Sequence, residues 1–150
     1  MEIRLENCYL EPSIKFLNQL KLKGKKSRAR TQLVKLLVEQ LRVLAEAQNA
    51  LVEEYGKRDE EGNFIHASEE KGGGVLIEPR KAKEYLKEHD LLMKEVAEIQ
   101  GATYIDHEKD MQMILEQCEL ELSGIDADVY DRLLEAFESK TREEDTHDGN

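Results

Sequence analysis

Residues 27–55 read SRARTQLVKLLVEQLRVLAEAQNALVEEY, and this stretch decides the fold. Apolar side chains recur along it in steps of three and four residues, which is the spacing of one helix face. The positions of this seam are Val34, Leu37, Leu41, Leu44, Gln48, Leu51 and Tyr55. Leucines repeat there at heptad intervals, and a polar residue such as Gln48 can fix the register of a heptad seam. The spacing therefore predicts one long helix over residues 27–55.

A second apolar stripe flanks the seam on the same helix. Its residues are Leu33, Leu36, Val43, Ala47 and Ala50. A helix with two apolar faces has to be covered from more than one side. We therefore expect residues 27–55 to form the central helix of the fold, the centre of an oligomer, or both.

Shorter elements are predicted on both sides of this helix. Further helices are predicted over residues 12–20, 79–99, 106–122 and 126–137. Short strands are predicted over residues 2–5, 64–65, 75–77 and 103–105, the middle two as a hairpin that contains residues 72–74, three glycines. The fold class predicted is mainly α (α+β), a helical bundle around one long central helix with a small β-sheet or hairpin. We expect a single domain over residues 1–138 and a disordered acidic tail over residues 139–150, which lack apolar anchors.

Local signals indicate where the helices begin and end. Pro12 is typical of the first turn of a helix, and Ser27 or Thr31 is a candidate cap for the long helix. Gly56 directly follows the long helix, as C-terminal glycines often do. Asp126 is a good N-cap for the last helix.

Composition narrows the class of protein. Charged residues make up 37% of the 150 residues and the formal net charge is −11, which argues against a surface that binds nucleic acid over its whole extent. No apolar run approaches the roughly 20 residues that span a bilayer. Two cysteines, Cys8 and Cys118, are too few for a disulfide framework, and we expect half-buried thiols in a reducing cytoplasm. We expect no membrane association.

Positive charge is concentrated in one place, the basic segment Lys21–Arg30. It holds six cations and no acid: Lys21, Lys23, Lys25, Lys26, Arg28 and Arg30. Removing these six charges leaves −17 on the other 140 residues. The segment leads into the long helix, where cations near the N-terminus cost about 0.3–1 kcal/mol each unless something compensates them. We therefore expect acidic groups, of this chain, of a partner protein or of a nucleic acid, to contact the basic segment.

Three interpretations of the basic segment stay open at this point. Its cations can pair internally with acidic helix faces, contact a protein partner, or neutralise nucleic-acid phosphates. Aromatic residues that would stack on single-stranded bases are absent from the segment, and Phe16 is the nearest.

Catalytic and metal-binding patterns are not found in the sequence. The four histidines are scattered, and the acidic cluster around His107 (Asp106, Glu108, Asp110) reads as the capped start of a helix. The three glycines precede an apolar strand and lack the Lys-Ser/Thr of a phosphate loop. We therefore expect no enzyme, no cofactor and no metal.

The run from Leu22 to Thr31, LKGKKSRART, carries a family resemblance. It is followed by Glu54-Tyr55 at the end of the long helix, by the turn Asp59-Glu60-Glu61-Gly62, and by Leu122-Ser123-Gly124. This order resembles a family of small proteins of unknown function from siphophages and prophages of Gram-positive bacteria. The resemblance implies a phage origin and action in the host cell cytoplasm, and it implies no activity.

Three functional hypotheses follow. The first is a non-enzymatic phage accessory protein that acts by protein–protein interaction through the seam or the basic segment, with a phage structural or host protein or as a homo-oligomer. The second is a nucleic-acid-binding protein acting through residues 21–30. The third is an inhibitor of a host antiviral defence system, for which the −17 outside the basic segment is the support. Membership of the virion stays open.

Overall fold

The computed structural model describes the backbone of residues 1–101 and 104–148 and the side chains up to residue 139, with the same gap at 102–103. The chain divides into two compact units. Unit 1 consists of Met1–Leu41 and Val96–Asn150, and unit 2 consists of Arg42–Glu95. The division falls inside the continuous helix Gly24–Tyr55.

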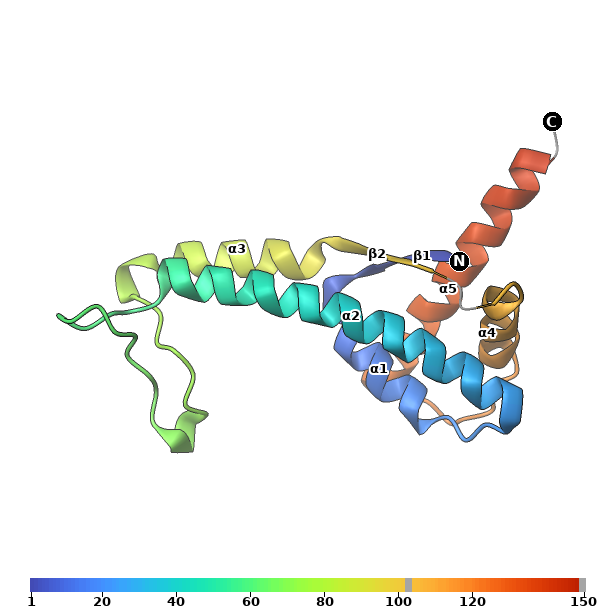
Figure 1. The fold of residues 1–150 in the computed structure, drawn as a ribbon, viewed down its shortest axis with the longest axis horizontal. Coiled ribbons are helices and arrows are strands. Elements are labelled where there is room, and N and C mark those ends of the chain that lie inside the picture. Colours follow the sequence, from blue (N-terminus) through green and yellow to red (C-terminus); the bar gives the residue numbers. More distant parts are fainter. Residues whose placement is uncertain (102–103, 149–150) are drawn as a thin grey trace. The chain divides into compact units, whose positions relative to one another are not determined.

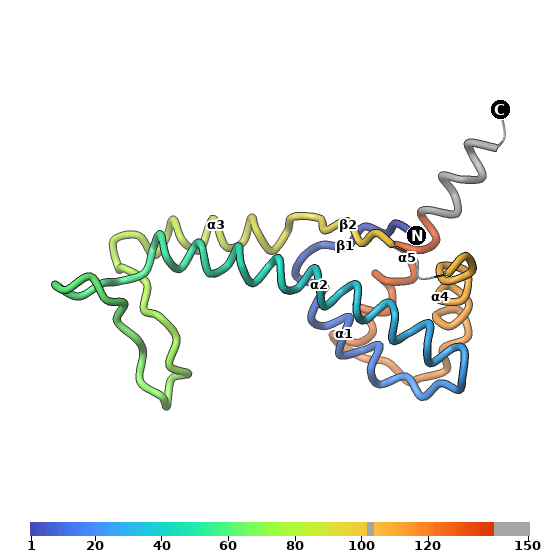
Figure 2. The backbone as a smooth tube through the Cα atoms, viewed as in Figure 1, coloured from blue at the N-terminus to red at the C-terminus, as the bar shows by residue number. Residues whose placement is uncertain are grey.

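The predicted fold class is confirmed. Within the described residues the chain forms five α-helices, of which one is long, and a two-stranded antiparallel sheet (Figures 1 and 2). The helices are α1 (Leu10–Gln19), α2 (Gly24–Tyr55), α3 (Ala82–Lys94), α4 (His107–Glu116) and α5 (Gly124–Asp148). The strands are β1 (Glu2–Glu6) and β2 (Val96–Gln100), and short 3-10 turns occupy Asn7–Tyr9, Glu69–Lys71 and Pro79–Lys81.

The sheet confirms one predicted strand and corrects one predicted helix. β1 pairs with β2 in antiparallel register, with Ile3 opposite Ile99. Both of these side chains are buried, as alternation along a half-buried strand requires. The helix predicted to reach Ile99 instead ends at Lys94, where Glu95 adopts an extended conformation (φ −59°, ψ 142°). The β-branched Val96 and Ile99 extend because β1 supplies the ladder hydrogen bonds.

Unit 1 has a continuous apolar core. Its fully buried side chains come from both strands and from α1, α2, α4 and α5. They include Ile3, Leu5, Leu10, Phe16, Leu17, Leu33, Leu37, Ile99, Met111, Leu115, Leu133 and Phe137. The ring of Phe16 meets that of Tyr130 edge to face at 6.1 Å between centroids, which joins α1 to α5.

The first two helices agree with the sequence apart from one boundary. Pro12 lies in the first turn of α1, as predicted. α2 begins at Gly24, three residues before the predicted start, and Ser27 and Thr31 therefore lie inside the helix and do not cap it. Gly24 has φ +48°, a conformation that glycine adopts without steric cost. α2 ends at Tyr55, as predicted.

The last helices differ more from their predicted bounds. α4 ends at Glu116 instead of near Leu122, and α5 starts at Gly124 and continues to Asp148 instead of ending near Phe137. Of the strand predicted at 103–105, Thr103 lies outside the described residues, whereas Tyr104 and Ile105 lie in a bend and a turn. A disordered tail and a single domain over residues 1–138 stay predictions.

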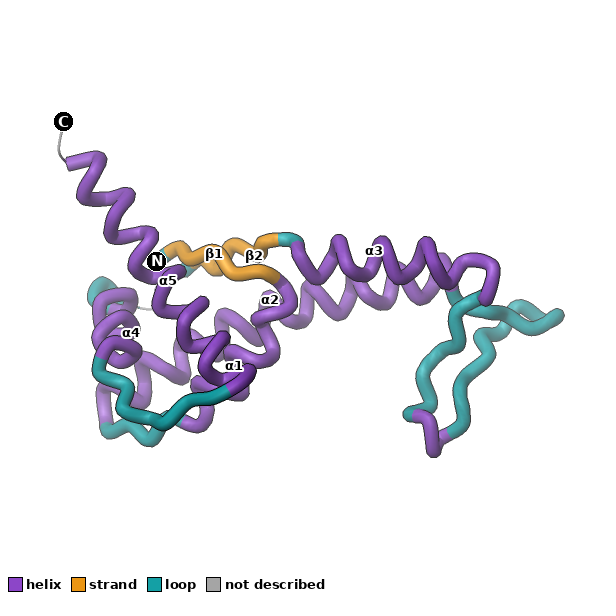
Figure 3. The backbone as a smooth tube through the Cα atoms, turned by 180° about the vertical axis from the view of Figure 1, so that it is seen from behind, coloured by secondary structure: helices purple, strands orange, loops and turns teal. Residues whose placement is uncertain are grey.

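In unit 2 the end of α2 and α3 lie side by side (Figures 1 and 3). The rings of Tyr55 and Tyr85 are 6.1 Å apart, and Gln48 Nε2 lies 3.7 Å from Met93 Sδ, so the two helices run antiparallel. The segment between them folds back on itself through single bridges, which include His66 with Val75. The predicted hairpin pairing is thus present, although without continuous strands.

Candidate functional site

The basic segment lies in unit 1, at the turn between α1 and α2. Lys21 and Lys23 belong to the turn, whereas Lys25, Lys26, Arg28 and Arg30 lie in the first two turns of α2. All six cations therefore gather where the helix dipole is positive, and the structure shows how three of them are compensated.

Arg30 caps the end of the preceding helix. Its Nη1 donates hydrogen bonds to the carbonyl oxygens of Leu17 (2.9 Å) and Leu20 (2.7 Å). Leu17 lies in the last turn of α1 and Leu20 directly follows the helix, where the partial charge is negative. The Leu17 carbonyl oxygen also accepts from the Leu20 N–H at 3.2 Å. Arg30 is half-buried and is a structural part of the α1–α2 turn.

Two lysines of the basic segment contact α4 or the residue after it. Lys25 Nζ lies 3.6 Å from an Asp110 carboxylate oxygen and 5.9 Å from the centroid of the Tyr104 ring. Lys26 Nζ donates to Gln117 Oε1 at 3.0 Å. Pairing within the protein therefore accounts for part of the positive charge of the basic segment. Both lysines are nevertheless mostly exposed, and such contacts contribute little to stability.

Lys21, Lys23 and Arg28 are the cations of the segment that stay exposed without such contacts among the described residues. With Lys25 and Lys26 they form the surface on which a partner could act. The prediction that the basic segment binds a partner stays a prediction.

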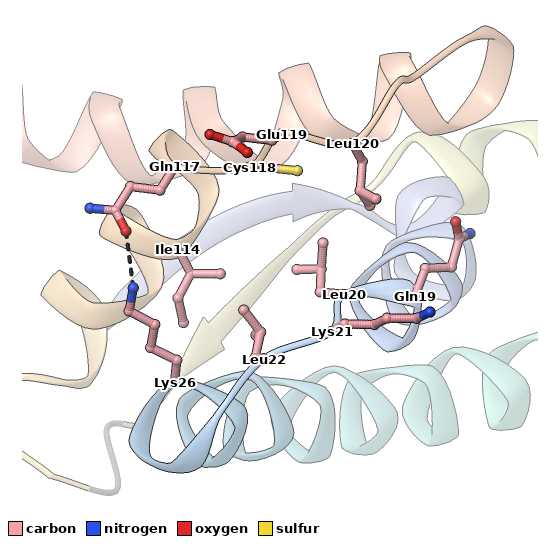
Figure 4. A pocket seen from close by; sticks show the side chains of 10 residues that line it. All are labelled: Gln19, Leu20, Lys21, Leu22, Lys26, Ile114, Gln117, Cys118, Glu119 and Leu120. Atoms are coloured by element: carbon pink, nitrogen blue, oxygen red, sulfur yellow. Dashed lines mark hydrogen bonds between the residues drawn. The ribbon is translucent and has the colours of Figure 1, made fainter.

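A pocket of about 400 Å³ opens beside the basic segment (Figure 4). Leu20, Leu22, Ile114 and Leu120 point into it and make an apolar floor (Figure 4). Its other lining residues are Gln19, Lys21, Lys26, Gln117, Cys118 and Glu119. The pocket suits an apolar group, but its rim carries both signs of charge. Cys118 and Cys8 are free and half-buried, as predicted.

Two aromatic residues beside the basic segment were not identified from the sequence as structural. His107, predicted only as part of an acidic helix start, is fully buried, and its Nε2 lies 2.8 Å from the Ala29 carbonyl oxygen of α2. Because a carbonyl oxygen can only accept a hydrogen bond, Nε2 is the ring nitrogen that donates in this contact. Tyr104 donates to Asp110 at 2.8 Å, and burial together with this hydrogen bond raises the pKa of Tyr104 to about 12. A histidine among helix-capping acids gives no sequence signal of burial.

The predicted helix seam is covered to different extents along the helix. Leu37, Leu44 and Tyr55 are buried, and the other seam residues, Val34, Leu41, Gln48 and Leu51, are half-buried. The second stripe behaves differently in the two units. Leu33 is fully buried in unit 1, whereas Val43 and Ala50 in unit 2 are exposed.

A second concave site lies in unit 2, between α2 and α3. This acidic groove has a volume of about 250 Å³ and is lined by Ala47, Leu51, Glu88, Leu91, Leu92 and Glu95. Its floor is apolar and its lining carries two carboxylates and no cation. Sequence reasoning placed Ala47 and Leu51 on apolar faces but did not identify the groove, because its shape depends on how α3 packs.

Further carboxylates lie near one end of the acidic groove, around Tyr55. Burial raises the pKa of the Tyr55 hydroxyl, and the carboxylates of Glu54 and Glu84 raise it further. Glu88, which lines the groove, also raises the pKa of Tyr55. The negative potential in this part of unit 2 therefore comes from both helices.

Among the described residues, no group of three or more His, Cys, Asp or Glu side chains is placed to hold a metal ion. In the same part of the chain, no helix combines the length and the apolar character needed to cross a membrane.

Comparison with curated proteins and with solved structures found no match. A family model matches residues 1–144, which include the basic segment, both units and most of α5. The chain therefore belongs to the family described as "Protein of unknown function (DUF1617)".

Proposed function

We propose that this protein is a non-enzymatic phage accessory protein that acts in the host cell cytoplasm by binding another protein. The phage origin is supported by the resemblance of the LKGKKSRART run and the motifs that follow it. Protein binding is supported by one observation in unit 2. Among residues 42–95, all of which are described, Leu44 and Tyr55 are the only apolar side chains that are buried.

The apolar surface of unit 2 is large for the core that it has. α3 has no buried residue, and Leu86 and Leu91 on this helix are 59% and 52% exposed. An isolated helix of this length is marginal in water, and most helical stability comes from packing of an apolar face. Contiguous exposed apolar surface marks protein-interaction sites, and Leu91 lines one concave surface together with Ala47, Leu51 and Leu92. A protein partner on unit 2 would supply the packing that the unit lacks.

Site-specific photo-cross-linking in infected cells tests this proposal. A photoreactive amino acid replaces Leu91 in one variant and Glu60, an exposed residue of the acidic turn in the same unit, in the control variant. We expect a discrete protein adduct from position 91 and none from position 60. No adduct at either position, or equal adducts at both, would contradict the proposal. An adduct of twice the protein's mass would identify a homo-oligomer.

A second candidate function is nucleic-acid binding, and the exposure of Lys21, Lys23 and Arg28 favours it. Each phosphate contact would release counterions and make binding fall steeply with salt. We expect any such affinity to disappear when these three residues are replaced by alanine. Absence of binding to DNA and RNA at about 50 mM salt, where electrostatic contacts are strong, removes this candidate.

A further inference from the structure

We propose that the acidic groove of unit 2 binds a basic amphipathic helix of the partner protein. This inference rests on the proposed function, because it names the chemistry of the partner that unit 2 would bind. The pocket beside the basic segment is larger, but Lys21, Lys26 and Glu119 on its rim do not select one sign of charge. The lining of the acidic groove carries carboxylates and no cation, and it therefore selects positive charge.

The shape of the acidic groove fits a helix. Ala47 and Leu51, one turn apart on α2, face Leu91 and Leu92 of α3 across its floor. Val43 and Ala50 are exposed and lie three or four residues from Ala47, so they extend the apolar surface along the same side of α2. A partner helix can place apolar residues at spacings of three, four and seven along such a strip.

The charge around the acidic groove selects a basic occupant. Glu84 and Glu88 are four residues apart on one face of α3, and Glu95, the residue that follows the helix, lines the same groove as Glu88. Glu54 of α2 lies close to Tyr55 and adds to the same end. The lysines of α3 (Lys83, Lys87 and Lys94) follow the same spacing one residue earlier, and they lie about 100° around the helix from the glutamates. Lysines and arginines flanking a partner's apolar stripe would meet the glutamates.

Other occupants fit less well. A second copy of unit 2, placed groove to groove, would bring the glutamates of both copies together, and like charges across an interface oppose association. A nucleic acid would be repelled by the same carboxylates. The basic segment of a second copy is a poor match, because two of its residues are already engaged inside unit 1. Arg30 donates hydrogen bonds to backbone carbonyl oxygens at the end of α1, and the side chain of Ala29 is buried.

Binding of a designed peptide to the full-length protein tests the inference directly. The probe is a labelled peptide of about 18 residues, made of leucine and lysine with leucine at helical spacing, so that it forms a basic amphipathic helix. One control peptide has the same composition in scrambled order, and another replaces lysine by glutamate. Fluorescence anisotropy measures the affinities, and far-UV circular dichroism verifies the fold of every protein variant.

Two protein variants separate groove binding from general attraction to an acidic protein. Glu88→Lys with Glu95→Lys reverses the charge of the groove, and Glu60→Lys with Glu61→Lys changes the same charge in the exposed turn of unit 2. We expect the groove variant to weaken binding of the basic amphipathic peptide about tenfold or more, and the turn variant by less than about twofold. If lysine at 88 and 95 disturbs the fold, the Glu88→Gln, Glu95→Gln variant replaces it, with Glu60→Gln, Glu61→Gln as its control. Leu91→Ser, which removes an exposed part of the floor, is also expected to weaken binding.

The inference is overturned if the scrambled peptide binds as tightly as the amphipathic one, or if the turn and groove variants have equal effects. It is also overturned if no peptide binds at low salt, or if only the acidic peptide binds. These results differ from failure of the proposed function, which is measured by cross-linking in cells. If the peptide binds in the groove but position 91 gives no adduct in cells, the inference that the groove binds a basic helix stands, and the proposed cellular function is wrong.

Discussion

Units 1 and 2 are built around the same helix and differ in what covers it. In unit 1 the side chains of Ala29, Leu33 and Leu37, spaced one turn apart on α2, are fully buried. In unit 2 the buried side chains of α2 are Leu44 and Tyr55, and the α3 helix beside them has none that is buried. The apolar spacing of α2 is equally regular in both. Regular spacing therefore indicates which face seeks burial, and the neighbouring elements decide how far that burial proceeds.

Under the proposed function, this difference gives the two units different roles. The buried side chains of unit 1 stabilise the fold, since burying one leucine or phenylalanine side chain contributes about 1.5–3 kcal/mol. The apolar side chains of unit 2 are left partly in water, where they are available to a partner.

The same substitution in the two units should have very different effects on stability. Leu17→Ala, at a fully buried position in unit 1, is expected to lower the free energy of unfolding by about 2–5 kcal/mol. Leu91→Ala, at a position 52% exposed in unit 2, is expected to change it by less than about 0.5 kcal/mol. Urea unfolding followed by circular dichroism measures both. Equal losses would show that the units are packed alike and would remove the basis of the comparison.

A second pair compares two arginines that donate to backbone carbonyls. Arg30 is half-buried in unit 1, and Arg58 in unit 2 is exposed, donating to the Gly62 carbonyl oxygen at 2.8 Å. Arg30→Ala is expected to cost about 1.5–3 kcal/mol, because it leaves carbonyls of α1 without their charged donor. Arg58→Ala should cost less than about 1 kcal/mol, although the guanidinium also lies over the Phe64 ring.

The same unfolding experiment compares the arginine variants. A loss from Arg58→Ala that matches the loss from Arg30→Ala would show that the connecting segment of unit 2 is as firmly held as the α1–α2 turn. A small loss of unfolding free energy from Arg30→Ala would show that the hydrogen bonds of Arg30 to α1 contribute little, and Arg30 would then be available to a partner.

Alkaline pH should act on unit 1 through Tyr104. Its pKa is raised to about 12, so its contribution to stability is complete below the ordinary tyrosine pKa of about 10 and is lost as the pH rises to about 12. Tyr104→Phe cannot ionise and should lose less stability than the wild type over this interval. At neutral pH the variant should be less stable by about 1 kcal/mol, through loss of the hydrogen bond to Asp110.

Absorbance at alkaline pH measures this titration. The wild type should show a tyrosine that ionises near pH 12, and this component should be missing from Tyr104→Phe. If the two titration curves coincide, burial and the hydrogen bond to Asp110 do not raise the pKa of Tyr104.

The sequence predicted the elements that depend on local spacing. β1, the first turn of α1 and the end of α2 lie where alternation, proline and glycine indicate them. It failed at Val96–Gln100, because Val96 and Ile99 are three residues apart, a spacing that fits one helix face, whereas in the strand the two side chains lie on opposite faces. The strand forms because β1 pairs with it from the other end of the sequence, and a local pattern contains no information about that partner.

The candidate sites were predictable to a smaller extent. The charge of the basic segment was visible in the sequence, but the hydrogen bonds of Arg30 to α1 require the angle at which α1 and α2 meet. Burial of His107 likewise depends on α4 packing against Ala29. The two glutamates that line the acidic groove look in the sequence like part of an ordinary solvated surface, because the groove exists only where α3 lies beside α2.

Hydrogen exchange along the whole chain is the most direct test of the difference between the units. Amides open with free energies that reflect local packing, so those of α3 should exchange at least about a hundredfold faster than those of α1 and the Val129–Phe137 part of α5. Addition of the basic amphipathic peptide should slow exchange in α3 and in α2 beyond Leu41, with unit 1 unchanged. Equal protection of α3 and α1 in the free protein would contradict the claim that unit 2 lacks a sufficient core of its own.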